Sequence, residues 1–167
     1  MSRVVDFYRG IRTDTEGRLL KDILAWPDDD LEEVHDFIQW LFPLPEPSQF
    51  HADAPLLTNE DIAAFKSDPI LQANLMKAFE RILPFLGLSL TDGNVVEGKN
   101  FKSRVADVWA MPNHNWLRIT RILRSLMLLG MEAQAQDFYE RLDALYRSRK
   151  FPIPAETFSY WTEAVGK

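Results

Sequence analysis

Four side chains that can stack or form directional hydrogen bonds lie close together in the chain: His35, Asp36, Gln39 and Trp40. On a helix, residues three and four apart are neighbours, so His35 would sit beside Gln39 and Asp36 beside Trp40. The indole could stack on a ligand while the polar groups hold it by hydrogen bonds. The pattern predicts a recognition surface. The structural alternative is common beside irregular segments: Trp40 lies in the core, and Asp36 and Gln39 fasten the backbone that follows.

A second polar cluster, Asn113, His114 and Asn115, opens a predicted helix, with Asn113 or Asn115 as its cap. Its side chains and the free backbone N–H groups behind them would form a corner that accepts anions. The alternative is a helix cap together with a buried histidine that bonds a neighbouring loop. We expect this cluster to lie close to the first one, so that the two form one pocket.

Three arginines, Arg118, Arg121 and Arg124, recur at intervals of three and predict a basic ridge along the same helix. Guanidinium groups suit a carboxylate or a phosphate. The alternative is pairing within the chain, which has 25 acidic residues. We expect no nucleic-acid partner, because the net charge is -6 and no aromatic residues alternate with the basic ones.

Linear signatures of catalysis and of metal binding are missing. Glu32 and His35 form one half of a di-metal helix motif without a second half, and the chain has no cysteine. It has no glycine-rich phosphate loop and no nucleophile elbow. We therefore predict no catalytic residues, no metal and no cofactor. Acid–base chemistry by Asp36 with His35 or His114 stays open, because a pocket assembled by folding leaves no linear trace.

Composition favours one globular domain over residues 1–167, with 46% hydrophobic residues. The N-terminus reaches Asp6 before any apolar run, which argues against a signal peptide. The most apolar stretch, residues 116–131, contains three arginines, so we expect no membrane insertion. We predict a soluble, cytoplasmic protein.

Apolar residues recur at helical spacing along the chain, and the helices that they predict would position these candidate residues. We predict an all-α fold of seven to nine helices around one core, with a proline-rich segment, residues 43–57, extended across the surface. Thr58 and Asp68 are the expected starts of two helices. Ser89–Lys99 reads as a loop, in which Val95 and Val96 would form at most a short strand. The predicted helices cover residues 4–9, 19–25, 28–41, 58–66, 69–84, 101–111, 115–129, 132–149 and 154–165. The helix from residue 69 should bury Ile70, Leu71, Leu75, Phe79, Ile82 and Leu83.

Three strings carry a resemblance to a known family: residues 35–44 (HDFIQWLFPL), 46–48 (EPS) and 113–123 (NHNWLRITRIL). They resemble the conserved N-terminal region of the opioid growth factor receptor family. The resemblance implies an intracellular domain unrelated to seven-helix opioid receptors, in a family whose animal founder is described as binding an enkephalin-type peptide. It brings no catalytic residues. Because extended C-terminal repeats are not visible here, we predict a bacterial or otherwise minimal member.

Taken together, these features predict a peptide- or protein-recognition domain that uses a groove near Trp40 and His114. The alternatives are an enzyme of unknown reaction and a structural module that assembles copies of itself. The oligomeric state and the identity of the ligand stay open. The candidate ligand-binding residues are His35, Asp36, Gln39, Trp40, Asn113, His114, Asn115, Arg118 and Arg121.

Overall fold

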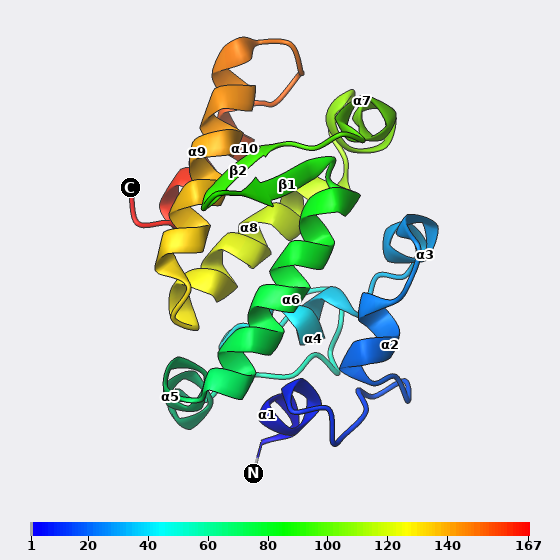
Figure 1. Ribbon diagram of the computed structural model, residues 1–167, viewed down its shortest axis with the longest axis vertical. Helices are drawn as coiled ribbons and strands as arrows, with labels where there is room; N and C mark the ends of the chain where they lie inside the picture. The colour runs from blue at the N-terminus through cyan, green and yellow to red at the C-terminus, as the bar shows by residue number, and fades with distance from the viewer. Residues whose placement is uncertain (1) are drawn as a thin grey trace. The chain divides into compact units, whose positions relative to one another are not determined.

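The computed structural model describes residues 2–167 and is mostly helical there (Figure 1). Within that range it has ten α-helices, one π-helical segment and one antiparallel pair of strands. The strands correct the prediction of a purely α-helical fold, and the ten α-helices exceed the seven to nine predicted. The chain divides into two units, one ending at Arg81 and one running from Ile82 to Lys167. The prediction of a single domain over residues 1–167 stays a prediction.

The first unit contains short helices and most of one long one. These are α1 (Arg3–Tyr8), α2 (Leu20–Leu24), α3 (Asp28–Glu33), α4 (Ile38–Leu41), α5 (Asn59–Ser67) and α6 (Pro69–Phe85), which ends in the second unit. Aromatic contacts join its elements. The ring centroids of Phe7 and Trp40 are 5.2 Å apart, and those of Tyr8 and Phe65 are 5.0 Å apart. The Tyr8 hydroxyl donates a hydrogen bond to the Leu41 carbonyl, and burial raises the pKa of this phenol. These contacts fix α4 against α1.

The predicted helix over residues 28–41 is broken, which is a correction. α3 ends at Glu33, Val34 is extended (φ -85°, ψ 126°), and α4 begins only at Ile38. Every residue from Phe37 to Leu44 is buried. A continuous helix would bury only one face, so the break and the short α4 let the whole run pack inside. His35 is therefore exposed in the break and does not lie one helical turn before Gln39.

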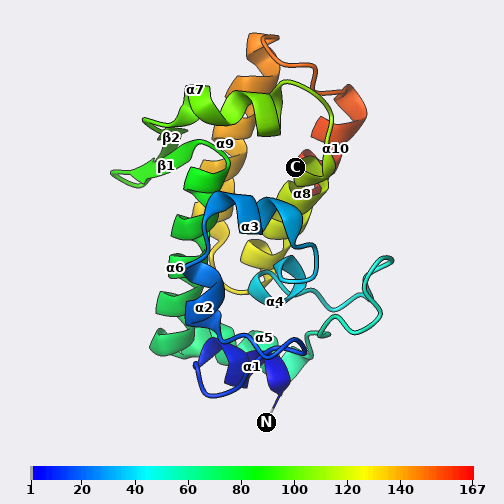
Figure 2. The same cartoon turned by 90° about the vertical axis from the view of Figure 1, so that its right-hand side faces the viewer.

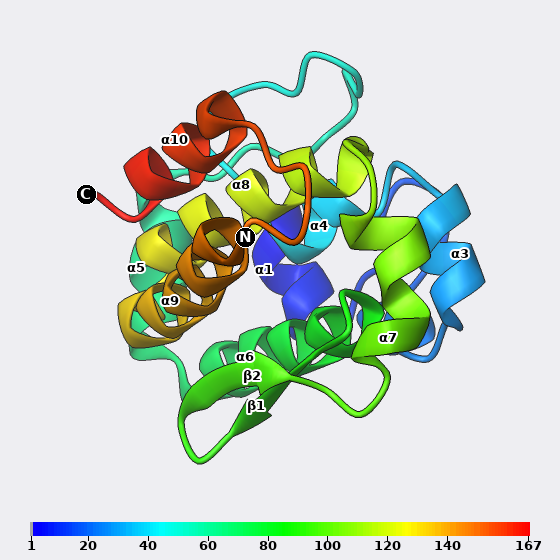
Figure 3. The same cartoon turned by 90° about the horizontal axis from the view of Figure 1, so that it is seen from above.

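The proline-rich segment between α4 and α5 is irregular, as predicted, but it forms a loop whose two ends meet. Leu44 pairs with Leu56 in a bridge, and the Leu57 amide donates to the Leu44 carbonyl at 3.0 Å. Figures 2 and 3 show the loop extending away from α4 and α5. It closes on the predicted capping box, in which Thr58 and Asp61 exchange two hydrogen bonds of 3.0 and 3.1 Å.

The second unit contains the end of α6, a hairpin and three long helices. Its elements are β1 (Leu88–Thr91), β2 (Asn94–Glu97), α7 (Phe101–Arg104), the π-helical η1 (Val105–Trp109), α8 (His114–Leu128), α9 (Glu132–Ser148) and α10 (Ala155–Ala164). α8, α9 and α10 pack on one another (Figure 3). The buried Trp161 indole donates to the Trp116 carbonyl at 3.1 Å, which joins α10 to α8.

The loop predicted over residues 89–99 is wrong, because β1 and β2 form a hairpin there. Asp92 and Gly93 have φ of 51° and 78°, the left-handed values that a two-residue turn of type I′ requires. Leu90 pairs with Val95 across the strands, and Arg141 of α9 donates to the Val95 carbonyl at 3.0 Å. The dipeptide Asp92-Gly93 is the sequence signal that should have predicted this hairpin.

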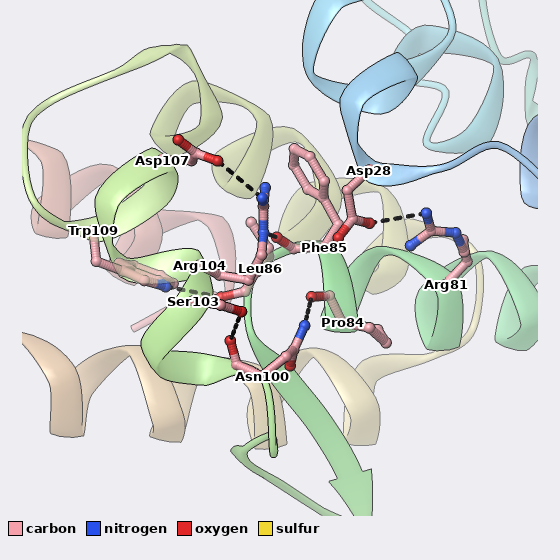
Figure 4. A network of polar contacts seen from close by, with 10 residues as sticks. All are labelled: Asp28, Arg81, Pro84, Phe85, Leu86, Asn100, Ser103, Arg104, Asp107 and Trp109. Atoms are coloured by element: carbon pink, nitrogen blue, oxygen red, sulfur yellow. Dashed lines mark hydrogen bonds and ion pairs between the residues drawn. The ribbon is translucent and has the colours of Figure 1, made fainter.

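The end of α6 is capped by side chains that follow it in the chain (Figure 4). Its last carbonyl groups would otherwise lack partners. Asn100 donates to the Pro84 carbonyl (2.8 Å), Arg104 to that of Phe85 (2.7 Å) and Trp109 to that of Leu86 (2.8 Å). The helix thus ends one residue after Pro84, close to the predicted boundary.

Two smaller predictions also change. Ile70, expected in the core, is 61% exposed on the first turn of α6. The helix expected over residues 101–111 is split into α7 and η1.

In the described part of the chain, no helix combines the length and apolar character needed to cross a bilayer.

Candidate functional site

A pocket of about 220 Å³ lies beside α4 within the first unit. Three segments line it: the turn before α2, the stretch from the α3–α4 break into α4, and the tip of the proline-rich loop. Its residues are Thr15, Glu16, Asp36, Gln39, Trp40, Phe50, His51, Ala52, Asp53 and Ala54. We call it the α4 pocket. It brings together Asp36, Gln39 and Trp40 of the predicted recognition surface, whereas His35 is not part of its lining.

Gln39 lines this pocket although it is largely buried. Its side chain is only 6% exposed, and its Oε1 atom accepts no hydrogen bond from residues 2–167. A buried amide oxygen without a donor costs about 1–3 kcal/mol, because it has lost its hydration. The atom is itself closed off from solvent, so other atoms of Gln39 line the pocket.

Trp40 lines the pocket and also belongs to the hydrophobic core. The residue is 1% exposed, its ring contacts Phe7, and the Arg3 guanidinium lies 5.3 Å from the ring centre. The structure thus supports the structural interpretation for Trp40. Within the lining, Phe50 is the large apolar side chain open to solvent, at 79% exposed.

The turn that carries Glu16 is held by a network of charges. Arg18 pairs with the buried Asp14 at 2.7 Å and with Asp36 at 3.0 Å. The Asp14 carboxylate also accepts hydrogen bonds of 2.9 Å from the backbone N–H groups of Glu16 and Arg18. The network fixes the backbone at Glu16, which lines the pocket together with Asp36 and Asp53.

The second predicted cluster lies in the other unit and is largely internal. Asn113, one of the two predicted caps, begins α8, since its Oδ1 accepts from the Asn115 amide at 2.9 Å. Its Nδ2 donates to the carbonyl groups of Val108 and Met111 at 2.8 and 2.7 Å. The Asn115 side chain is fully buried and accepts from Arg118 at 3.2 Å.

The predicted basic ridge is corrected in part. Arg118 is only 7% exposed, and Arg121 and Arg124 are half-buried. An exposed stripe of three guanidinium groups is therefore absent from α8. His114 is half-buried in the first turn of the same helix. The expected joint pocket of His114 with Trp40 stays a prediction, because the two residues belong to different units.

Sequence reasoning missed the contributions of Glu16, Phe50, His51 and Asp53 to the pocket. One signal was available: Phe50 is a lone large aromatic residue in a loop of small and polar residues. The meeting of residues 15–16 with residues 50–54 depends on tertiary packing and leaves no linear pattern. Residues 2–167 contain no group of three or more histidine, cysteine or acidic side chains arranged to hold a metal ion.

Comparison with known proteins gives one family. The family model described as "Opioid growth factor receptor (OGFr) conserved region" matches residues 2–165. The chain is 43% identical over 137 residues to the human protein named opioid growth factor receptor, an overlap of 77% of this chain and 20% of that protein. The mouse protein of that name is 43% identical over 136 residues, 77% of this chain and 21% of its own length.

The mouse opioid growth factor receptor-like protein 1 is 38% identical over 124 residues, which are 71% of this chain and 26% of that protein. The chain thus spans about a fifth to a quarter of the length of these curated relatives. The relatives are vertebrate proteins, so the prediction of a bacterial or minimal member has no support. No solved structure matches the chain significantly.

Proposed function

This chain belongs to the opioid growth factor receptor conserved-region family, and on that basis we propose that it is a recognition domain that binds a peptide or protein segment at the α4 pocket. Relatives that cover most of the chain are named as receptors, which implies a ligand or a protein partner for them. The observation that carries the proposal for this chain is the lining of the α4 pocket, which joins polar residues such as Asp36 and Gln39 to the exposed Phe50.

The size of the pocket favours a side chain or chain end over a whole small molecule. Ligand pockets typically measure about 300–1,000 Å³, whereas the α4 pocket measures about 220 Å³. Beside it, the exposed Phe50 provides an apolar anchor of the kind that dominates binding energy at protein interfaces. A peptide would place one group in the pocket and pack an apolar residue on Phe50.

Two predictions from the sequence remain part of this proposal. His114 and Arg121 stay candidate partner-binding residues of the second unit, half-buried on α8. The cytoplasmic location also stays a proposal. Neither an enzymatic reaction nor self-assembly is favoured by a specific feature of the described residues.

Peptide display tests the proposal. Random peptides are selected on the immobilised full chain, and the dissociation constants of the best ones are measured by fluorescence anisotropy. Ala52→Trp fills the mouth of the pocket from an exposed lining position. Ala63→Trp adds the same side chain at an exposed site on α5 and serves as the control.

We expect Ala52→Trp to weaken binding by about ten-fold or more, because it removes at least one well-made contact of about 1.4 kcal/mol. Ala63→Trp should bind like the wild type. Equal affinities of the wild type and Ala52→Trp would place the peptide elsewhere and contradict the proposal.

A further inference from the structure

We infer that the connection between α9 and α10 forms a second binding surface, which docks an acidic peptide segment with an apolar side chain between its carboxylates. This connection, orange in Figure 1, lies wholly in the second unit, so the inference does not depend on the α4 pocket. It borders a pocket of about 460 Å³, and ligand pockets typically measure about 300–1,000 Å³. We call it the α9–α10 pocket, and its lining consists of Tyr146, Arg147, Arg149, Phe151, Ile153 and Ala155.

Aromatic packing holds the apolar side of the α9–α10 pocket in place. The Tyr146 ring stacks on Phe158 of α10, with centroids 4.2 Å apart and planes 8° apart. The Phe151 ring meets Phe101 edge-on, with centroids 5.9 Å apart. Ile153 is 7% exposed, and its amide donates to the Phe151 carbonyl at 2.9 Å. A pocket whose walls are already fixed loses little conformational entropy when a ligand binds.

The same stretch is positively charged, although the whole chain has a net charge of -6. Three cations fall within four residues: Arg147, Arg149 and Lys150. Arg147 pairs with Asp143 at 2.7 Å, but within residues 2–167 no ion pair involves Arg149 or Lys150. Such a local excess of positive charge attracts carboxylates and opposes cationic partners.

One acidic residue, Glu156, follows the lining residue Ala155 in the chain. Its carboxylate is occupied, because it accepts a hydrogen bond of 2.7 Å from the Tyr160 hydroxyl one turn further along α10. Glu156 therefore does not pair with the cations at the end of α9.

Arg149 has a backbone conformation that ordinarily favours glycine. It ends α9 with a φ of 58° and a ψ of 19°, in the left-handed region. Helices often end on such a residue, usually glycine, because a Cβ makes this conformation less favourable. Cations near the end of a helix complement its dipole, but Arg147 and Lys150 already supply them. A strained arginine in a pocket lining thus points to a role for its side chain in binding.

These features favour an acidic peptide over a nucleic acid. Guanidinium groups bind carboxylates with two parallel hydrogen bonds, and the apolar walls accept a side chain. Base stacking needs open aromatic faces along a groove, whereas one face of Tyr146 is covered by Phe158. The net charge of -6 also opposes a long polyanion.

Titration of the ¹⁵N-labelled full chain with three short peptides tests the inference. Acetyl-Glu-Glu-Phe-Glu-Glu-amide carries the charges and the ring. One analogue has glutamine in place of each glutamate, and another has alanine in place of phenylalanine. We expect the first peptide to shift the backbone amides of residues 146–151 and 153. It should bind about ten-fold more tightly than either analogue, since each analogue loses at least one well-made contact.

Two results of this titration would overturn the inference. One is an analogue that binds as tightly as the first peptide, or a first peptide that gives no saturating shifts at these residues. The other is a short single-stranded oligothymidylate that shifts the same amides at lower concentration than the peptide does, which would assign the surface to nucleic acid.

Arg149→Gly separates binding from folding. We expect this variant to bind the acidic peptide about ten-fold more weakly, because a charge-assisted contact is lost. It should melt at the same temperature as the wild type or higher, because glycine adopts the left-handed conformation without strain. Arg12→Gln removes a positive charge from an exposed position of the first unit and should bind like the wild type. Wild-type affinity of Arg149→Gly, or a loss of binding that comes with a lower melting temperature, would contradict the inference and leave the proposed function of the α4 pocket untouched.

Discussion

Gln39 combines two properties that a purely structural residue does not need to combine. It is buried next to Trp40, and its side-chain oxygen has no donor within residues 2–167. If Gln39 served to fasten the proline-rich loop, that oxygen would accept a hydrogen bond from the loop backbone. The unpaired oxygen therefore costs the folded protein stability.

Gln39→Met therefore distinguishes the two roles. Methionine has a similar shape and carries no polar group that needs a partner, so we expect the variant to be as stable as the wild type or more stable by about 1 kcal/mol. Urea denaturation measures the difference. A loss of stability of about 2 kcal/mol or more would mean that Gln39 holds the fold together.

The charge of Asp68 makes the stability of the protein depend on pH. A hydrogen bond from the Ile70 backbone amide lowers the pKa of its carboxyl, and the Arg9 guanidinium at 2.9 Å lowers it further. A carboxyl whose pKa is lower in the folded state stabilises the protein above its unfolded pKa. That contribution disappears as the pH falls through the folded pKa.

Asp68→Asn should thus lower the urea midpoint at neutral pH, and the gap to the wild type should close as the solution becomes acidic. Denaturation curves at a series of pH values give the comparison. A gap that stays constant with pH would show that the charge of Asp68 is not what stabilises the start of α6.

At the scale of elements, caps and turns decide where helices begin, and some of them can be read from the chain. Asn113 combines a cap bond to Asn115 with two donated bonds to Val108 and Met111, so it fixes both the start of α8 and the turn before it. Asn113→Ala should cost about 1–2 kcal/mol of unfolding free energy, as the loss of an N-cap does.

Asn113→Asp is the matched control, because aspartate keeps the cap acceptor and loses the two donors. Its stability should fall between the wild type and the alanine variant in thermal denaturation. An alanine variant with wild-type stability would contradict this role of Asn113.

Local signals predicted the helix starts at Thr58, Asp68 and Asn113, because side-chain capping lies within a few residues of sequence. The break between α3 and α4 could not be predicted the same way. The stripe from Leu31 to Leu41 fits a helix, but tertiary packing buries every residue from Phe37 to Leu44, and burial overrides the local preference. The hairpin could have been predicted from Asp92-Gly93. It was missed because helical spacing dominates the rest of the sequence.

At the scale of the whole molecule, the two longer strings that carry the family resemblance, residues 35–44 and 113–123, lie in different units, and both contain deeply buried residues. Trp40 is 1% exposed in the first unit, and Trp116 is 3% exposed in the second. Packing thus explains part of the resemblance. What packing does not explain is the set of polar groups around the α4 pocket, of which Asp36 and Gln39 were predicted and Glu16 and Asp53 were not. The latter two are joined to the site only by folding.

The central claim is that a peptide binds at the α4 pocket, and mapping of chemical shifts tests it most directly. The ¹⁵N-labelled full chain is titrated with a peptide obtained by display. We predict that the largest shifts fall on the Gln39 side-chain amide and on the backbone of residues 15–16 and 50–54. Saturating shifts confined to α8, α9 and α10, with the Gln39 amide unmoved, would contradict the claim.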